Sequence, residues 1–285
     1  MAVKKYENLV NRLKFMKGRG GANARELVFV GGDQLQGFEL NFIIGVYDQT
    51  GDWAPNMGAH IHPFDECLLF FGYDDNDLNI LGSDMSLCVG KEYEEHKFSV
   101  PTVVAAPANL PHCPLVTEKV YRPFGHFHLA CAAKYAGSSV KQEGATDGKK
   151  YDYLFKTMKA EKGAAGGNAA QVISVQGNDV SGIPINFNMS LCNKNGVWNP
   201  GKGAWMHPYD SVLVFFGHKT DDLSYLGAEI SLEIGQEHEK YTFDAPTAVA
   251  LPKGTPYASV TCSKMEKPYG VMQIGLNAKY QHSEA

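Results

Sequence analysis

The sequence lacks long apolar runs, an excess of basic residues and paired cysteines. No segment approaches the ~18 consecutive apolar residues of a membrane-spanning helix, and charged residues interrupt the N-terminal segment too often for a secretory signal. The net charge is −5, which argues against nucleic acid or an anionic membrane surface as a partner. The six cysteines form no CxxC pair, so they are expected to be reduced thiols of a cytoplasmic protein.

What the sequence does contain is one unit that occurs twice. Residues 4–135 align with residues 149–280 without a gap, and GAHIHPFDECLLFFG, for example, matches GAWMHPYDSVLVFFG. At 285 residues, 44% of them hydrophobic, the chain can supply two cores. We therefore predict an N-terminal domain over residues 1–140 and a C-terminal domain over residues 141–285, joined near the Gly- and Ser-containing segment 136–148.

Each unit begins with a segment of helical periodicity and continues with short β-type runs. In residues 4–17, Tyr6, Leu9, Leu13 and Phe15 recur about every three to four positions, which predicts a short amphipathic α-helix. The later runs are rich in β-branched and aromatic residues and are separated by Gly, Pro, Asn and Asp, a pattern typical of a β-sandwich or β-barrel. The predicted fold class is all-β, with two tandem antiparallel β-barrels, each preceded by a short α-helix.

Three histidines and one glutamate of the first unit form the strongest candidate site. His60 and His62 are two positions apart, so on a strand they project from the same face. Glu66 follows Pro63 and can fold back beside them, and His112 follows a turn that can bring it in from a neighbouring strand. Three imidazoles and one carboxylate suit one divalent transition metal, Fe, Mn, Ni, Co or Zn. One or two positions on the metal would remain for substrate or water.

These residues also carry a family resemblance. The run G-x-H-x-H-x-x-x-E-x-x-x-x-x-G at residues 58–72, followed by P-x-x-x-P-H at residues 107–112, resembles the two metal motifs of the cupin superfamily. Because the repeat supplies two such units, the resemblance extends over nearly the whole chain and is to the bicupins. It implies the double-stranded β-helix, or jelly roll, and a metal held by the four residues named above. Asn109 stands where the family usually has a glycine, which the second unit keeps as Gly254.

The second unit acts as an internal control. At the four positions that match the ligands it has Trp205, His207, Ser211 and Tyr257, and one histidine among four residues cannot hold a metal. The surrounding scaffold sequence is nevertheless kept, as the matching FFG motifs show. The fold therefore does not need the ligands, which indicates that the first unit keeps them for chemistry and that the C-terminal domain is metal-free.

Five further residues are weaker candidates. His126 and His128 occur only in the first unit, and we interpret them as a proton donor or acceptor, or as groups that orient a ligand; an interface pair is the alternative. Arg19 and Arg25 lie in or beside a Gly-rich loop and could clamp a substrate carboxylate, although solvated surface charges are the alternative. Tyr47 could line the cavity.

The site is compatible with three functions. The leading hypothesis is a metal-dependent lyase, isomerase or decarboxylase that acts on a small carboxylate or phenolic substrate by Lewis-acid and acid/base chemistry. The first alternative is an Fe(II)-dependent dioxygenase at the same ligands, since cupins with this ligand set include both kinds. The second is a non-catalytic storage or ligand-sensing bicupin. The expected partner is a small-molecule substrate, and a homo-oligomer is compatible with the resemblance.

Overall fold

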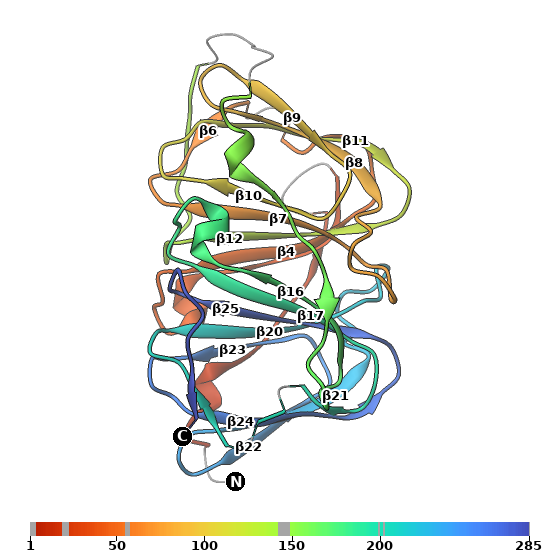
Figure 1. The fold of residues 1–285 in the computed structure, drawn as a ribbon, viewed down its shortest axis with the longest axis vertical. Coiled ribbons are helices and arrows are strands. Elements are labelled where there is room, and N and C mark those ends of the chain that lie inside the picture. Colours follow the sequence, from red (N-terminus) through yellow and green to blue (C-terminus); the bar gives the residue numbers. More distant parts are fainter. Residues whose placement is uncertain are drawn as a thin grey trace.

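The computed structural model describes residues 4–18, 23–54, 58–141, 149–198, 200–201 and 203–284. These residues form antiparallel strands in four sheets (Figure 1). The only helical elements among them are four short 3-10 helices: η1 (Glu7–Leu9), η2 (Gly32–Leu35), η3 (Asp152–Leu154) and η4 (Gly177–Val180). In this part of the chain no helix has the length and apolar character needed to cross a membrane.

The N-terminal half is built from two sheets that face one another. The larger sheet comprises β2 (Met16–Lys17), β3 (Ala24–Val30), β4 (Asn41–Tyr47), β7 (Glu66–Gly72), β10 (Thr102–Ala106), β12 (Phe124–Ala130) and β14 (Phe155–Thr157). Its strand order is β14-β10-β7-β12-β4-β3-β2. The smaller sheet comprises β5 (Gly51–Asp52), β6 (His60–Ile61), β8 (Ser83–Val89), β9 (Glu94–Phe98), β11 (His112–Val120) and β13 (Ser138–Ser139). Its order is β13-β6-β11-β8-β9, with β5 paired to β11.

The C-terminal half repeats this plan. The larger sheet comprises β1 (Val10–Arg12), β15 (Glu161–Lys162), β16 (Ala169–Val175), β17 (Asn186–Cys192), β20 (Ser211–Gly217), β23 (Thr247–Leu251) and β25 (Tyr269–Gly275), in the order β1-β23-β20-β25-β17-β16-β15. The smaller sheet comprises β18 (Gly196–Val197), β19 (Trp205–Met206), β21 (Ala228–Ile234), β22 (Glu239–Phe243), β24 (Tyr257–Met265) and β26 (Ser283–Glu284). Its order is β22-β21-β24-β19-β26, with β18 paired to β24.

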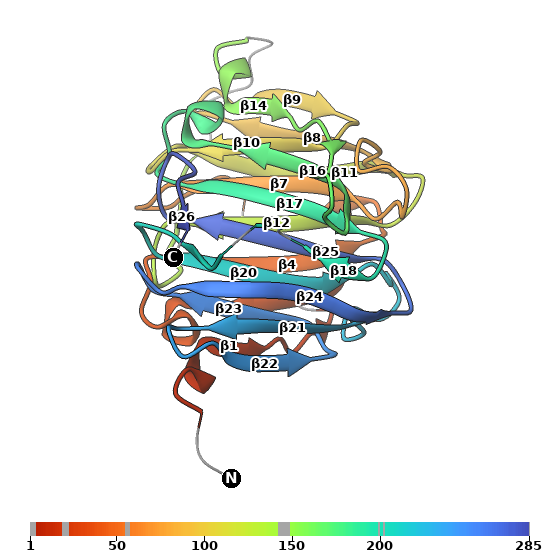
Figure 2. The same ribbon diagram turned by 60° about the horizontal axis from the view of Figure 1, so that its bottom comes forward.

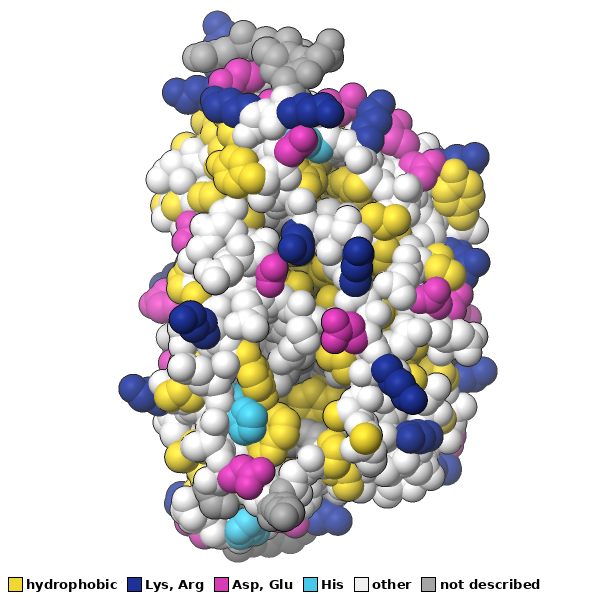
Figure 3. All heavy atoms as spheres, in the orientation of Figure 1, with side chains coloured by type: hydrophobic (Ala, Val, Ile, Leu, Met, Phe, Trp, Pro, Cys, Tyr) yellow, Lys and Arg dark blue, Asp and Glu magenta, His cyan; other side chains and the backbone are white. Residues whose placement is uncertain are grey.

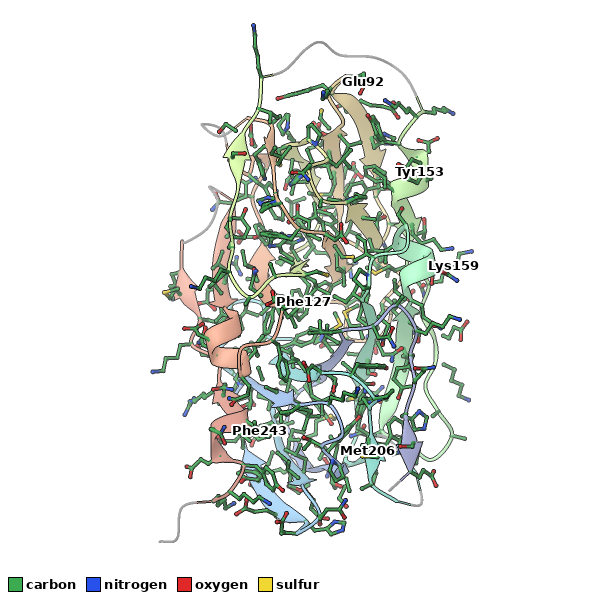
Figure 4. The ribbon with its side chains drawn as sticks, turned by 90° about the vertical axis from the view of Figure 1, so that its left-hand side faces the viewer. Glu92, Phe127, Tyr153, Lys159, Met206 and Phe243 are labelled. Carbon is green, nitrogen blue, oxygen red and sulfur yellow. The ribbon has the colours of Figure 1, made fainter. Side chains whose placement is uncertain are left out.

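The two large sheets pack against each other in the middle of the molecule. Every residue of β7, β12, β20 and β25 is buried, because one face of each strand lines its own barrel and the other contacts the opposite half. The ring of Phe216 lies 5.5 Å from that of Phe127 and 6.0 Å from that of Phe71. Figure 4 shows Phe127 at this junction. Successive side chains point to opposite faces, so Phe127 faces outward while its neighbours His126 and His128 face the barrel interior.

The predicted N-terminal α-helix is wrong, and so is its counterpart in the second unit. Residues 7–9 form only one 3-10 turn, after which the chain continues as the strand β1. Leu9 and Leu13 are buried, as the periodicity suggested, but the backbone between them pairs with the edge strand β23. Hydrogen bonds and packing offered by that edge outweigh the weak local helical preference.

The first segment of each half pairs with the other half. In β1, Val10 lies opposite Val249 of the C-terminal sheet, and in β14, Phe155 lies opposite Val104 of the N-terminal sheet. Figure 2 shows β1 and β14 at opposite ends of the molecule. We call β1 and β14, each with the 3-10 turn before it, the exchanged arms. Residues 10–12 therefore belong in space to the sheet of the C-terminal half.

Candidate metal centre

The four predicted ligands come from the ends of three strands, β6, β7 and β11, that meet at one end of the N-terminal barrel. His60 begins β6 and His112 begins β11, and the two residues are direct partners in the antiparallel ladder. His62 comes directly after β6, and Glu66 is the first residue of β7. All four side chains are buried. Positions that are distant in sequence are thus brought to one place by strand register.

The three histidine rings cluster tightly. Their ring centroids are 4.4 Å apart for His60 and His112, 4.9 Å for His60 and His62, and 5.3 Å for His62 and His112. One nitrogen from each ring lies within 4.8 Å of the corresponding nitrogens of the other two. This spacing lets a single cation contact all three imidazoles, which are the usual ligands of Zn, Cu, Fe and Ni in proteins.

Backbone carbonyls fix the orientation of each ring. The Nδ1 atom of His62 lies 2.6 Å from the carbonyl of Ala136. The Nδ1 atom of His112 lies 3.1 Å from that of Leu110, and His60 makes the same kind of contact with Gly58 at 3.3 Å. A carbonyl only accepts, so each Nδ1 carries the proton and each Nε2 presents a lone pair. This arrangement is common among metal-binding histidines.

Glu66 supplies a fourth donor atom to the same point. Its Oε1 atom lies 2.9 Å from Nε2 of His112 and 3.7 Å from Nε2 of His62. Oε1 is buried and makes no hydrogen bond of acceptable geometry to any described residue. A carboxylate oxygen and an imidazole lone pair repel each other at this distance unless a cation or a proton lies between them. The residues present therefore fit a bound metal ion.

The protonation of the four groups follows from burial and from their neighbours. Burial lowers the pKa of His60 to about 4 and also lowers the pKa of His62, so both rings are neutral at physiological pH. Burial alone would lower the pKa of His112, but the adjacent negative charge of Glu66 raises it. Burial alone would likewise raise the pKa of Glu66, but His128 and His112 hold it well below its usual range. Glu66 is thus an anion, which suits a metal ligand.

The two histidines predicted to be catalytic, His126 and His128, lie in the same pocket but make different contacts. His128 Nε2 is 2.5 Å from Oε2 of Glu66, so its ring donates to the oxygen that does not face the three other histidines. His126 donates from Nδ1 to the carbonyl of Leu69 at 3.0 Å. Burial lowers the pKa of His126 to about 3, so this ring is neutral and accepts at its remaining nitrogen. His128 therefore contacts the Glu66 carboxylate, and His126 lines the cavity; their predicted role in catalysis stays a prediction.

A cavity of ≈ 160 Å³ adjoins the cluster, and it is lined by both sheets. Tyr47 lines it, stacked on Trp53 with ring centroids 3.8 Å apart. Tyr135 also lines it, and its hydroxyl lies 3.4 Å from Nε2 of His62. The sequence gives no signal for Tyr135, because the second unit has a tyrosine at the same position, Tyr280, and a residue present in both units does not distinguish the one with the histidines.

The structure does not bring Arg25 to this pocket. Its guanidinium forms an ion pair with Asp48 and donates to the carbonyl of Thr220, in the other half of the molecule, at 3.2 Å. Arg19 lies outside the described residues, so its predicted role in binding substrate stays a prediction. Among the described residues that line the cavity there is no lysine or arginine.

At the matching place in the C-terminal half, a hydrogen-bonded group of neutral residues takes the place of the ligands. His207 contacts the hydroxyl of Tyr257 at 3.1 Å and the amide of Gln273 at 2.7 Å through Nε2, while its Nδ1 bonds to the carbonyl of Gln281. The Gln273 amide also donates to Tyr257 at 3.1 Å. The single remaining histidine is thus fully bonded to protein groups. Among the described residues, this half contains no cluster of three potential metal ligands.

Comparison with known proteins finds likeness in structure but not in sequence. No family model and no curated protein matches the chain. Among solved structures, oxalate decarboxylase from Bacillus subtilis at pH 4.6 matches with a TM-score of 0.64 at 9% identity, over 100% of this chain and 79% of that chain. A structure of the same enzyme, described for the assignment of its Mn(II) centres, gives 0.64 at 9% identity, over 100% and 80%. A third, on its substrate binding mode, gives 0.62 at 9% identity.

The chain therefore has a bicupin fold over its whole length, with two cupin-like halves of antiparallel sheets. The N-terminal half carries a candidate metal site of three histidines. At 9% identity the likeness shows the fold alone. The Mn(II) centres and the activity on oxalate are properties of the Bacillus subtilis enzyme.

Proposed function

We propose that this protein is a mononuclear metal-dependent enzyme that acts on a small oxygenated substrate, a carboxylate or a phenol, in a lyase, isomerase or decarboxylase reaction. The observation that carries the proposal is the set of three buried imidazoles whose lone pairs converge beside an unpaired carboxylate oxygen. A divalent ion held by His60, His62, His112 and Glu66 would supply a Lewis acid for a substrate oxygen. The structural likeness to a metal-dependent decarboxylase supports the same class.

The residues around the site have separate tasks. The carbonyls of Gly58, Ala136 and Leu110 hold the three imidazoles in one tautomer and orientation. His128 holds the carboxylate of Glu66, and His126, being neutral, offers a hydrogen-bond acceptor to a substrate hydroxyl. Preorganised groups of this kind need little rearrangement when substrate binds.

The cavity restricts the substrate to a small molecule. A volume of ≈ 160 Å³ lies below the ~300–1,000 Å³ that is typical of pockets for drug-sized ligands. This space admits a short carboxylate or a single ring. The aromatic wall formed by Tyr47 and Trp53 excludes water from one side of the site and is compatible with either substrate.

Elemental analysis of the protein purified without added metal tests the proposal, with His62→Ala as the variant and His207→Ala as its matched control. The two histidines occupy equivalent positions in the repeat. We expect about one metal ion per chain in the wild type and in His207→Ala, and a loss of affinity of at least ~100-fold in His62→Ala, because a direct ligand is removed. Equal metal content in both variants, or none in the wild type, would contradict the site.

Turnover assays then distinguish the functions. Small carboxylates, beginning with oxalate, and simple phenols are offered to the metal-loaded protein, and product and dissolved O2 are both followed. Product formed without consumption of O2 supports the proposal. Consumption of one O2 per product would assign the dioxygenase alternative, for which the ligand set is equally suitable. A protein that binds these compounds at the metal without turning any over would be a storage or sensing protein.

A further inference from the structure

The C-terminal half has kept a cavity at the place where the N-terminal half has its metal pocket, and it is larger. Its volume is ≈ 400 Å³, against ≈ 160 Å³ in the N-terminal half. Five residues that line it occupy the same repeat positions as residues that line the metal pocket: Asn188, Trp198, Trp205, Gln273 and Tyr280. Pockets of about 300–1,000 Å³ are typical of small-molecule sites. The C-terminal half has thus lost the ligands without filling the space.

The lining of this cavity carries no formal charge. Among the described residues that line it there is no aspartate, glutamate, lysine, arginine or histidine. Two titratable groups at or next to the cavity are held neutral, since burial lowers the pKa of His207 and raises the pKa of Tyr280. Burying a charged molecule here without a partner charge is unfavourable, because the charge loses its hydration and finds no counter-charge. The cavity therefore favours a neutral ligand.

Aromatic rings dominate the wall and are fixed in place. The Nε1 atom of Trp198 donates to the hydroxyl of Ser190 at 3.0 Å. Trp205 is stacked on His282, with ring centroids 4.5 Å apart and an angle of 21° between the rings. Figure 3 shows a hollow bordered by hydrophobic side chains in the lower half of this face of the molecule. Fixed indole rings favour planar ligands, because aromatic groups stack with offset or edge geometry at little entropic cost.

Two amides give the cavity polar groups for recognition. The side chain of Asn188 lines it and makes no hydrogen bond to another described residue. Its counterpart in the metal pocket is Ile43, so the polar group is particular to this half. Gln273 is held by His207 and Tyr257, which fixes its amide at the inner end. A few polar groups in a mostly apolar pocket set the orientation of a ligand.

We propose that the C-terminal barrel is a second binding site, which takes a neutral, planar aromatic molecule of one or two rings with at least one hydrogen-bonding group. The ligand lies against Trp198 and Trp205 and is oriented by Asn188 and Gln273. Binding does not involve the metal site of the other half, so this proposal can be tested separately from the proposed enzymatic function.

Calorimetry on protein dialysed against a chelator tests the proposal, with 2-naphthol as the neutral probe and 2-naphthoate as a charged probe of similar shape. We expect one 2-naphthol bound per chain and an affinity for 2-naphthoate at least ~10-fold weaker, because the carboxylate finds no cation in the cavity. Equal affinity for both probes, or no binding of 2-naphthol, would overturn the proposal.

Substitutions of residues that line the cavity test whether 2-naphthol binds there. Val172 lines the cavity, and Val172→Phe should fill it and weaken 2-naphthol binding at least ~10-fold. Val100→Phe makes the same change at an exposed position of the other half and serves as the control. Trp205→Ala should weaken binding similarly and Trp205→Phe should largely retain it, which keeps the test decisive if Val172→Phe does not fold. Unchanged affinity in both Val172→Phe and Trp205→Ala would place the probe elsewhere.

Discussion

At the scale of single residues, the chemistry of the site depends on which atom of each side chain is free. The imidazoles of His60, His62 and His112 have their Nδ1 protons committed to backbone carbonyls, and Glu66 has one oxygen committed to His128. The Nε2 atoms of the three rings and Oε1 of Glu66 then lie close to one another, and of the other described residues only Tyr135, through its hydroxyl, makes a polar contact with one of them, Nε2 of His62. Local hydrogen bonding thus leaves these atoms in an arrangement that suits a metal ion.

The contact between His128 and Glu66 leads to a testable prediction. Replacing His128 by Leu removes the donor to Oε2 of Glu66 and should lower metal affinity ~10–100-fold, as loss of an orienting partner does in other metal sites. His128→Gln should stay within a few-fold of wild type, since an amide N–H can donate in its place and Gln273 occupies the equivalent position of the other half. Chelator competition measures both affinities. Equal losses in the two variants would mean that His128 acts only through packing.

Metal retention should also depend on pH. Coordination requires neutral imidazoles, and His60 and His62 are neutral because burial lowers the pKa of each. His112 has a raised pKa, because Glu66 outweighs burial, so protons compete with metal mainly there. Metal affinity therefore falls as the pH drops below the pKa of His112, and metal is released at a lower pH that depends on its free concentration.

Dialysis from pH 8 to pH 5 followed by elemental analysis should show this release, and a higher free metal concentration should move the midpoint to lower pH. Circular dichroism on the same samples is the control for unfolding. A midpoint that does not respond to the metal concentration would contradict direct competition.

At the scale of elements, the exchanged arms connect the two halves. Each arm begins with a 3-10 turn whose leucine is buried in the half that the arm joins: Leu9 packs in the C-terminal core cluster, and Leu154 in the cluster that contains the N-terminal core. Polar contacts add to this. Glu94 accepts the backbone N–H groups of Lys150 and Tyr151 at 3.1 and 3.0 Å. The sequence repeat alone does not reveal the exchange. An arm that pairs with its own half and an arm that pairs with the other half would give the same repeat in the sequence.

The exchange predicts which half of the molecule is destabilised by a mutation in an arm. Leu9→Ala should cost about 2–5 kcal/mol and increase hydrogen exchange in β23, although residue 9 lies in the first half of the sequence. Leu154→Ala should instead increase exchange in β10. Hydrogen-exchange mass spectrometry of the two variants compares these strands directly. Increased exchange in the sequence-adjacent sheet, rather than in the partner sheet, would show that the arms do not cross.

At the scale of the whole molecule, two large sheets share an aromatic junction and two arms. Phe127 is fully buried there against Phe216. Both halves therefore bury part of their core only in the presence of the other. We expect the chain to unfold as one unit rather than as two independent domains.

Calorimetric unfolding tests this expectation. The wild type should show a single transition, and Phe127→Ala should lower its free energy of unfolding by about 3–5 kcal/mol while keeping it single. Tyr153→Ala, at a position 66% exposed, is the control and should change little. Two separate transitions, with only one shifted in Phe127→Ala, would show that the halves are thermodynamically independent.

The sequence by itself determined the all-β class, from short runs rich in β-branched and aromatic residues, and the repeat, and it singled out His60, His62, Glu66 and His112 as candidate ligands. Strand register decided that these four side chains meet, since His112 lies far along the chain from the other three. Only the tertiary structure decided that residues 7–12 form a 3-10 turn and a strand instead of a helix, since the unpaired edge of β23 lies far away in sequence. It also decided that Arg25 binds Asp48 rather than lying at the histidine pocket, and that Tyr135 lines the pocket. These outcomes depend on partners that strand pairing brings together, and no local pattern encodes them.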